Sequence, residues 1–232
     1  MSMLIFAHRG ASKAAPENTV KAFKLAFEQR ADGIEFDTYQ HESGIIVFHD
    51  RTLTRRARES GYLLDVPWQS LTEMDIGDGE RIPTLTETLN CVPKDKWCNI
   101  EIKHLRDVDS WIKDVKAAVQ QSGINAEKLL ISSFNHHWLQ AIALKWPEVK
   151  IGALSASYEL DCTASARALN AYSVNIALDA VDKQFVQTAQ QDGFDVFVYT
   201  VDEPRDMLML KEWGVTGIFT NVPDLALDVL SS

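Results

Sequence analysis

Short strand-like runs of aliphatic and aromatic residues alternate with longer amphipathic stretches along almost all of the 232-residue chain. This alternation is typical of β-α units, because parallel strands are usually joined through helices. Eight strand-like runs follow it, at residues 4–8, 33–37, 98–103, 129–133, 150–155, 172–178, 195–201 and 217–221. Eight units predict an α/β fold of the (β/α)8 or TIM barrel type, although an open doubly wound sheet has the same local pattern.

The stretches between the strand-like runs carry helix signals. Apolar residues at i, i+3, i+4 and i+7 predict helices over residues 108–119 and 139–146. Asp107 is expected to cap the first of these, and Thr84 with a glutamate three residues later has the spacing of a capping box. Pro16 is expected in the first turn of an earlier helix.

The segment after the second strand departs from the alternation. Residues 45–49 form a ninth strand-like run after a turn at Glu42-Ser43-Gly44, which predicts a β-hairpin excursion. Antiparallel pairing about Ser43 would place His49 opposite Asp37. Residues 51–81 are polar and irregular, with a short helical stretch near 71–74, so we expect a long loop or small insertion there. No repeat or linker divides the chain, and a single domain over residues 1–232 is expected.

The composition argues against two classes of protein. The chain carries 33 acidic and 23 basic residues, for a formal charge of -10, so a broad basic surface for nucleic acid is not expected. No apolar run reaches the roughly 18 residues that a membrane span needs. The first residues lack the basic and apolar regions of a secretory signal, so we expect a cytoplasmic protein. The sequence leaves the oligomeric state open.

Charged side chains cluster at the ends of the first three predicted strands, where a barrel collects its functional groups. Glu35 and Asp37 lie two residues apart and share one face of their strand, as do Glu101 and Lys103 on the next. Three carboxylates at one rim repel one another unless a cation lies between them, and hard divalent metals prefer oxygen ligands. The pattern therefore favours a metal site. The alternatives are solvated charges, or Lys103 as a counter-charge in place of a metal.

Two histidines follow predicted strands toward the same rim. His8 ends the first strand and His49 ends the hairpin. An imidazole pair can provide a general base for an attacking hydroxyl and a general acid for a departing alcohol, while Arg9 and Lys103 would neutralise phosphoryl oxygens. Structural roles are expected for the remaining histidines, His41, His104, His136 and His137.

Short motifs in a fixed order cover nearly the whole chain. They are Ala7-His8-Arg9-Gly10, Ala15-Pro16-Glu17-Asn18-Thr19, Ile34-Glu35-Phe36-Asp37, Val47-Phe48-His49-Asp50, Pro83-Thr84-Leu85, Asn99-Ile100-Glu101-Ile102-Lys103, Ser132-Ser133-Phe134, Val198-Tyr199-Thr200-Val201 and Gly214-Val215-Thr216-Gly217-Ile218-Phe219-Thr220-Asn221. With these motifs the chain resembles the glycerophosphodiester phosphodiesterase family, whose members are phospholipase-C-like TIM barrels.

The resemblance implies a metal-dependent site for a small-molecule glycerophosphodiester. The matching positions are Glu35, Asp37 and Glu101 as ligands of one divalent ion, Mg or Ca, His8 and His49 as the acid/base pair, Arg9 and Lys103 on the phosphate, and Phe134 and Tyr199 as substrate contacts. For Phe134 and Tyr199, barrel packing is the alternative role.

Some positions depart from the family pattern. Residues 55–61 keep an arginine, Arg55, but one glycine where the family usually has two, so the choice of head group is left open. Tyr199 stands where tryptophan is common. Glu17 and Asn18 either brace Arg9 or open a helix after Pro16.

The leading hypothesis is a metal-dependent phosphodiesterase that converts glycerophosphodiesters to sn-glycerol 3-phosphate and an alcohol. Within the same class, the alternatives are a lysophospholipase D-like enzyme and one that stops at a cyclic phosphate. Outside it, the alternative is a catalytically silent phosphate-binding barrel. Serine hydrolases, P-loop NTPases and Rossmann enzymes are not expected, because their glycine-rich and nucleophile motifs are absent from the sequence.

Overall fold

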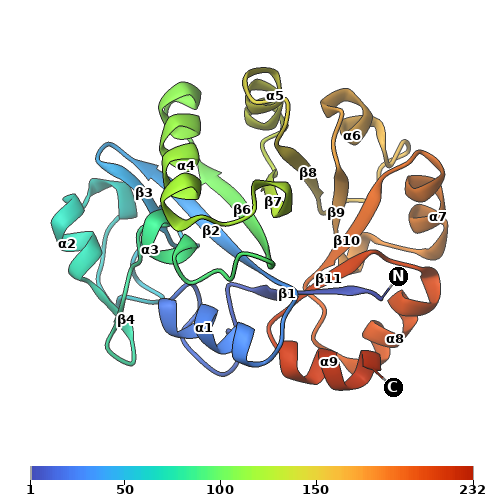
Figure 1. Ribbon diagram of the computed structural model, residues 1–232, viewed down its shortest axis with the longest axis horizontal. Helices are drawn as coiled ribbons and strands as arrows, with labels where there is room; N and C mark the ends of the chain where they lie inside the picture. Colours follow the sequence, from blue (N-terminus) through green and yellow to red (C-terminus); the bar gives the residue numbers. More distant parts are fainter. Residues whose placement is uncertain (1, 232) are drawn as a thin grey trace.

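The computed structural model describes residues 2–231, and in it eight parallel strands close into a barrel with helices on the outside (Figure 1). Around the barrel the strands follow the order β1-β11-β10-β9-β8-β7-β6-β2, and β1 pairs with β2 to close the ring. They are β1 (Leu4–His8), β2 (Gly33–His41), β6 (Trp97–His104), β7 (Leu129–Ser133), β8 (Lys150–Ser155), β9 (Ser173–Ala177), β10 (Asp195–Tyr199) and β11 (Gly217–Thr220). The closed ring confirms the predicted TIM barrel.

Helices lie between successive barrel strands, and a last helix, α9, follows β11. They are α1 (Val20–Glu28), α3 (Leu85–Leu89), α4 (Val108–Ser122), α5 (His136–Lys145), α6 (Ala164–Leu169), α7 (Lys183–Gln191), α8 (Pro204–Trp213) and α9 (Pro223–Ser231), with 3-10 turns η2 (Ala126–Lys128) and η3 (Leu178–Ala180). The predicted capping by Asp107 and the capping box at Thr84 are confirmed. The prediction for Pro16 is wrong: α1 begins at Val20, because the Thr19 side chain caps it by accepting from a backbone N–H of its first turn.

The middle of the barrel interior is apolar, and the carboxyl ends of the strands carry polar side chains. Four buried side chains fill the apolar part: Phe6, Leu130, Phe197 and Phe219. Residues two positions further along the same strands, among them His8 and Tyr199, share their inward face because strand side chains alternate. Phe36 and Ile102 point outward into the core beneath the helices, which confirms that Glu35, Asp37, Glu101 and Lys103 face inward.

The hairpin after β2 forms as predicted, with a different register. β3 (Gly44–Val47) pairs antiparallel with the end of β2, and Thr38 faces Val47. Asp37 is level with Phe48, whose N–H donates to the Asp37 carbonyl at 3.0 Å. His49 is therefore not opposite Asp37, because the turn consists of Glu42 and Ser43 rather than being centred on Ser43.

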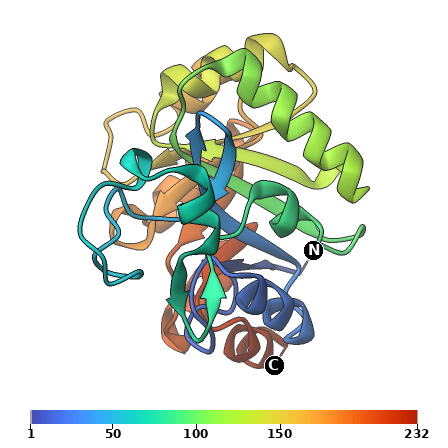
Figure 2. The same ribbon diagram turned by 90° about the vertical axis from the view of Figure 1, so that its left-hand side faces the viewer.

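Residues 51–81 are a folded insertion rather than an irregular loop. They contain η1 (Leu63–Asp65), α2 (Trp68–Glu73) and a small hairpin of β4 (Asp75–Gly77) and β5 (Glu80–Arg81). Four of their side chains, Leu53, Leu63, Leu71 and Ile76, are buried in a separate cluster with Tyr39 of β2, Ile46 of β3, Phe48 and Ile82. Figures 1 and 2 show the insertion at one side of the barrel, next to β2 and β3.

The described part of the chain contains no helix that could span a membrane. Across residues 2–231, every helix is too short or too polar to cross a bilayer.

Candidate active site

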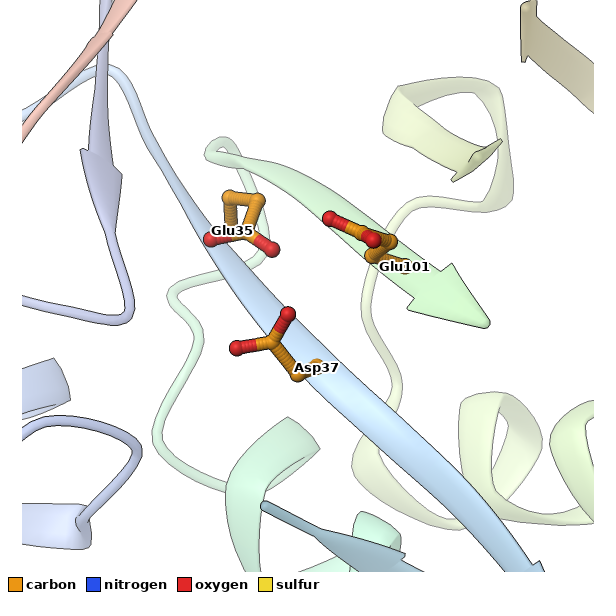
Figure 3. Close-up of side chains that lie close together, drawn as sticks. All are labelled: Glu35, Asp37 and Glu101. Atoms are coloured by element: carbon orange, nitrogen blue, oxygen red, sulfur yellow. The ribbon is translucent and has the colours of Figure 1, made fainter. Parts of the chain in front are cut away.

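Three buried carboxylates from adjacent strands form the centre of the site. Glu35 and Asp37 come from β2 and Glu101 from β6, and the parallel register places Asp37 beside Glu101. Their side chains lie close together on one face of these two strands (Figure 3). One oxygen of each lies within 4.8 Å of one oxygen of the others, and the residues are 3%, 0% and 7% exposed.

The donor set of this cluster fits a hard divalent cation. In each carboxylate, one buried oxygen accepts no well-aligned hydrogen bond from the described residues; the three are Glu35 Oε1, Asp37 Oδ1 and Glu101 Oε1. Lys103 compensates in part, since its Nζ lies 3.1 Å from Asp37 Oδ1 and pairs with Glu101. Within residues 2–231, no ion pair reaches Glu35 Oε1. One lysine therefore does not satisfy all three oxygens, whereas a divalent ion prefers such ligands.

Burial acts against full ionisation of the cluster. Together with the charges of Asp37 and Glu101, it raises the pKa of Glu35 well above its usual value. Burial and the Asp37 charge also raise the pKa of Glu101 to about 7. Burial acts on Asp37 too, but Lys103 and Arg9 outweigh it and hold the pKa of Asp37 below its usual value. A bound divalent cation would favour the ionised form of all three.

His8 ends β1 beside the cluster, and Asn221 sets its ring orientation. Its Nδ1 lies 2.9 Å from Asn221 Oδ1, and because that oxygen can only accept, Nδ1 carries the proton. The amide is itself oriented, since its Nδ2 donates to Asp202 Oδ2 at 2.7 Å. The other ring nitrogen, Nε2, lies 3.9 Å from Glu35 Oε2. Burial and the Arg9 charge lower the pKa of His8 to about 4, so the ring is neutral at pH 7 with its lone pair on Nε2.

His49 follows the hairpin and contacts a carboxylate. Its Nδ1 lies 2.6 Å from Asp50 Oδ1, which can only accept when ionised, so Nδ1 donates and Nε2 is left for proton exchange. The Tyr39 hydroxyl donates to the His49 carbonyl at 3.2 Å, which ties this residue to β2. His49 is also close enough to act electrostatically on Asp37.

Arg9 lies in the turn after β1 with a left-handed backbone, φ 60°. Its backbone N–H donates to Glu35 Oε2 at 3.0 Å, and the Nε of its side chain lies 3.2 Å from Asp37 Oδ2. Glu17 braces the same guanidinium, since Arg9 Nη1 donates to Glu17 Oε1 at 3.1 Å. Asn18 instead braces a carboxylate, because its Nδ2 donates to Asp37 Oδ2 at 2.8 Å.

Phe134 and Tyr199 form an aromatic wall next to Lys103. Their rings meet edge to face at 6.1 Å, and Lys103 Nζ lies 5.9 Å from the Phe134 ring centroid. The Tyr199 hydroxyl donates to the Ser155 carbonyl at 2.8 Å, which orients its ring. Phe134 is 50% exposed. Tyr199 also packs on the apolar cluster inside the barrel, whereas Phe134 leaves half of its surface free beside the charged cluster.

A pocket of about 540 Å³ opens beside Lys103, where the barrel meets the insertion. Tyr39, Lys103 and His104 line its barrel side, and Arg51, Tyr62, Leu64 and Asp65 line its insertion side. Tyr39 of the pocket wall also donates to the His49 carbonyl, and Lys103 of the same wall pairs with Asp37 and Glu101, so the pocket shares residues with both parts of the site.

The sequence reasoning missed the partners of the two histidines. Asn221 directly follows β11, which pairs with β1, so the rule that strand-end polar residues converge could have found it. Asp50 adjoins His49 in the chain, but adjacency alone does not predict a contact. Two of the four histidines expected to be structural have such contacts: His41 accepts from the Ser43 N–H, and His136 donates to the Leu154 carbonyl. His104 stacks on the Tyr39 ring, and its buried Nδ1 has no hydrogen-bond partner among the described residues.

Known proteins are similar to this chain in both sequence and fold. The sequence matches the Glycerophosphoryl diester phosphodiesterase family over residues 8–225. A glycerophosphodiester phosphodiesterase of Caldanaerobacter subterraneus subsp. tengcongensis is 34% identical over 239 residues, which cover 99% of this chain and 98% of that protein. The structure of an Oleispira antarctica phosphodiesterase in complex with the product sn-glycerol-3-phosphate aligns at a TM-score of 0.91 and 26% identity, over 100% of this chain and 98% of that one. The chain therefore belongs to the glycerophosphoryl diester phosphodiesterase family and is a phosphodiesterase.

Proposed function

We propose that this protein hydrolyses glycerophosphodiesters to sn-glycerol 3-phosphate and an alcohol, using one divalent metal ion and two histidines. The observation that carries the proposal is that three buried carboxylates lie with His8 and His49 at the carboxyl ends of the barrel strands. The related O. antarctica enzyme binds sn-glycerol-3-phosphate, which supports the glycerol half of the substrate.

Glu35, Asp37 and Glu101 would hold the metal, and their oxygen ligands suit Mg²⁺ or Ca²⁺. When bound, the ion would supply positive charge to a phosphate oxygen and lower the pKa of the adjacent glycerol hydroxyl. Arg9 and Lys103 both contact Asp37, so they hold the carboxylates in place and also bring positive charge to the phosphate.

His8 acts as the general base. Its hydrogen bond to Asn221 leaves the Nε2 lone pair on the side of the carboxylates, where it can take the proton of the attacking hydroxyl. As that proton moves to Nε2, the hydroxyl oxygen bonds to phosphorus. The Asn221 carbonyl, oriented by Asp202, stabilises the imidazolium that results.

His49 acts as the general acid. Its Nε2 proton passes to the alcohol oxygen as the bond from that oxygen to phosphorus breaks, and Asp50 holds the ring through Nδ1. Attack by the neighbouring glycerol hydroxyl gives a cyclic phosphate at this stage. Water then opens the ring, with the two histidines in reversed roles.

The insertion at residues 51–81 selects the alcohol. Its pocket includes Tyr39, which holds the His49 backbone, and His49 is the residue that would give its proton to the departing oxygen. Tyr62, Leu64 and Asp65 give its wall both apolar and charged groups, so it would distinguish alcohols by charge and size. Phe134 and Tyr199, which lie next to Lys103 and do not line this pocket, would contact the glycerol.

A substrate panel assayed with Mg²⁺, with Ca²⁺ and with excess EDTA tests this function. We expect sn-glycerol 3-phosphate and free alcohol as products, and no turnover after chelation. His8→Ala and His49→Ala should each lose about 10² to 10⁴ in rate with metal content unchanged. Full activity in EDTA, with no metal found by elemental analysis, would contradict metal dependence. Near wild-type turnover of either histidine variant would contradict the acid/base pair.

The same panel separates the alternatives. Accumulation of a cyclic phosphate indicates an enzyme that stops at that stage, and preference for lysophospholipids indicates a lysophospholipase D-like activity. A silent phosphate-binding barrel is disfavoured, because both histidines and all three carboxylates are present. A cytoplasmic location stays a prediction, which fractionation of the producing cells tests.

A further inference from the structure

Glu17, in the loop between β1 and α1, is a buried carboxylate that binds three arginines. It is 8% exposed. Its Oε1 accepts from Arg9 Nη1 at 3.1 Å and from Arg55 Nη2 at 2.6 Å. Its Oε2 accepts from Arg55 Nη1 at 3.0 Å and also from Arg56. Glu17, Arg9, Arg55 and Arg56 are called the Glu17 cluster below.

The Glu17 cluster connects two parts of the active site that lie on different elements. On the barrel side, Arg9 Nε lies 3.2 Å from Asp37. On the insertion side, Arg55 Nε donates to Asp50 Oδ2 at 2.6 Å, and the other oxygen of Asp50 binds His49 Nδ1 at 2.6 Å. An unbroken series of charged contacts therefore runs from His49 through Asp50, Arg55, Glu17 and Arg9 to Asp37.

His49 depends on side-chain contacts for its orientation more than His8 does. His8 is within β1, whereas His49 lies two residues beyond the end of β3, and their side chains are 15% and 30% exposed. Asp50 can hold the His49 ring in one orientation only if its own carboxylate is fixed. Arg55 suits that purpose, because its planar guanidinium binds Asp50 through Nε and Glu17 through both Nη atoms.

The charge of Glu17 is maintained in this setting. Burial acts to raise its pKa, but hydrogen bonds from Arg55 and Arg56 outweigh burial and hold the pKa of Glu17 below its usual value. The carboxylate therefore stays ionised and keeps its charge-assisted hydrogen bonds to the guanidinium groups.

We propose that Glu17 is a positioning residue for the acid step: through Arg55 and Asp50 it sets the orientation of His49 without touching the substrate. The inference rests on the proposed function, because it requires His49 to be the general acid. In Glu17→Gln the amide offers one acceptor oxygen in place of two, so Arg55 keeps its bond to Asp50 but loses the two-oxygen contact that stops the guanidinium from rotating. The His49 ring then adopts orientations in which its Nε2 proton misses the departing oxygen, and a displacement of about 1 Å can cost about 10²-fold in rate.

The leaving group provides the test. p-Nitrophenolate departs without a proton, whereas choline does not, so loss of the acid slows a p-nitrophenyl ester of glycerol 3-phosphate far less than glycerophosphocholine. Alcohol release is measured in a single turnover, which isolates cleavage of the bond to the alcohol. Glu17→Gln and Arg55→Gln should slow choline release about 10- to 100-fold and p-nitrophenol release less than about 3-fold. Arg55 is 46% exposed, so Arg55→Gln carries the test if Glu17→Gln does not fold.

A double-mutant cycle tests the route through His49. In a His49→Ala background, Glu17→Gln should cost less than about 2-fold, because the group that it positions is gone. The matched control is Asp78→Asn, which breaks another ion pair between insertion and barrel, Asp78 with Lys21 at 3.1 Å. Both of its side chains are largely exposed, and the variant should react with both substrates at the wild-type rate.

Several outcomes overturn the inference. Glu17→Gln does not position His49 if it slows both substrates equally, leaves both rates unchanged, or adds its full effect in the His49→Ala background. If His49→Ala is itself unselective between the substrates, the acid assignment of the proposed function fails and the inference falls with it. A selective His49→Ala with an unselective Glu17→Gln refutes the positioning role alone.

Discussion

Replacing Glu35 by glutamine should stabilise the metal-free protein and remove its response to metal. Glu35 is the carboxylate of the cluster with the weakest compensation, because Asp37 and Glu101 pair with Lys103 and Glu35 does not. Its Oε2 accepts from the Arg9 N–H at 3.0 Å, a bond that the glutamine carbonyl can keep. The substitution thus removes a buried charge with little change in shape.

The size of the gain follows from the charge separation. With oxygens within 4.8 Å of one another, Glu35 is repelled by Asp37 and by Glu101 by about 3.5 kcal/mol each at an effective dielectric constant of about 20. The positive charges of Arg9 and Lys103, together with partial protonation, offset most of this repulsion. We expect a net gain of about 2 kcal/mol, which raises the melting temperature of a chain of this size by about 4–8 °C.

The gain should depend on pH with a defined sign. Burial and the two neighbouring carboxylates raise the folded-state pKa of Glu35 well above its ordinary value of 4.5. Between the ordinary and the folded-state pKa the native state binds more protons than the unfolded state, so the metal-free wild type loses stability as pH rises through that range. Glutamine does not titrate, and the advantage of the variant in EDTA should grow as pH rises from the ordinary carboxylate pKa toward the raised pKa of Glu35.

Metal should reverse the order of stability. An ion at 100 times its Kd stabilises the native state by about 2.7 kcal/mol, or about 5–11 °C in melting temperature, for the wild type. Glu35→Gln should keep less than about 2 °C of this response. Differential scanning calorimetry in EDTA, in Mg²⁺ and in Ca²⁺ measures both effects. The reasoning is refuted if the variant melts below the wild type in EDTA at neutral pH, or responds to metal as fully as the wild type.

Further variants test the pocket and the base. Asp65→Asn and Tyr62→Ala should change the ranking of alcohols in kcat/KM, whereas equal slowing of every diester would count against selection by the pocket. Asn221→Leu removes the acceptor of the His8 Nδ1 proton, and it should slow glycerophosphocholine and the p-nitrophenyl ester alike, by about 10²-fold or more, because both need the base. A loss confined to glycerophosphocholine would instead assign His8 to the acid step.

The barrel and its carboxylates could be predicted because they follow from strand periodicity. Glu35 and Asp37 share a face by their spacing, and successive parallel strands of a barrel are neighbours, so Glu101 had to lie next to them. The hairpin register could not be predicted as well. The length of its turn decides the register, and the turn differs from the expected one, so the register is offset by one residue and His49 is not level with Asp37. In a strand, an offset of one residue also exchanges the two faces.

The insertion could be expected from its length, but its internal fold could not be predicted because its apolar residues have no period. Leu53, Leu63, Leu71 and Ile76 are spaced unevenly, and they are buried only by packing on the hairpin of β2 and β3. The contacts of Glu17 with Arg55 and Arg56 likewise join loops that are 38 and 39 residues apart in the chain. No local pattern of charge predicts such pairs, since each partner alone resembles an ordinary exposed charge.

The residues proposed for metal binding and for the base step lie on barrel strands, whereas the residue proposed for the acid step lies beside the insertion. The proposed metal ligands and the proposed base are on β1, β2 and β6, inside a closed ring of backbone hydrogen bonds that leaves them little freedom. His49, the proposed acid, lies between β3 and the insertion, and the same insertion forms one wall of the pocket next to Tyr39 and Lys103. Changes in the insertion can therefore alter the choice of alcohol without disturbing the carboxylates, provided that Asp50 and Arg55 keep their contacts. Because Glu17 belongs to the barrel and binds Arg55 of the insertion, its proposed role would keep His49 aligned with the phosphate while the rest of the pocket varies.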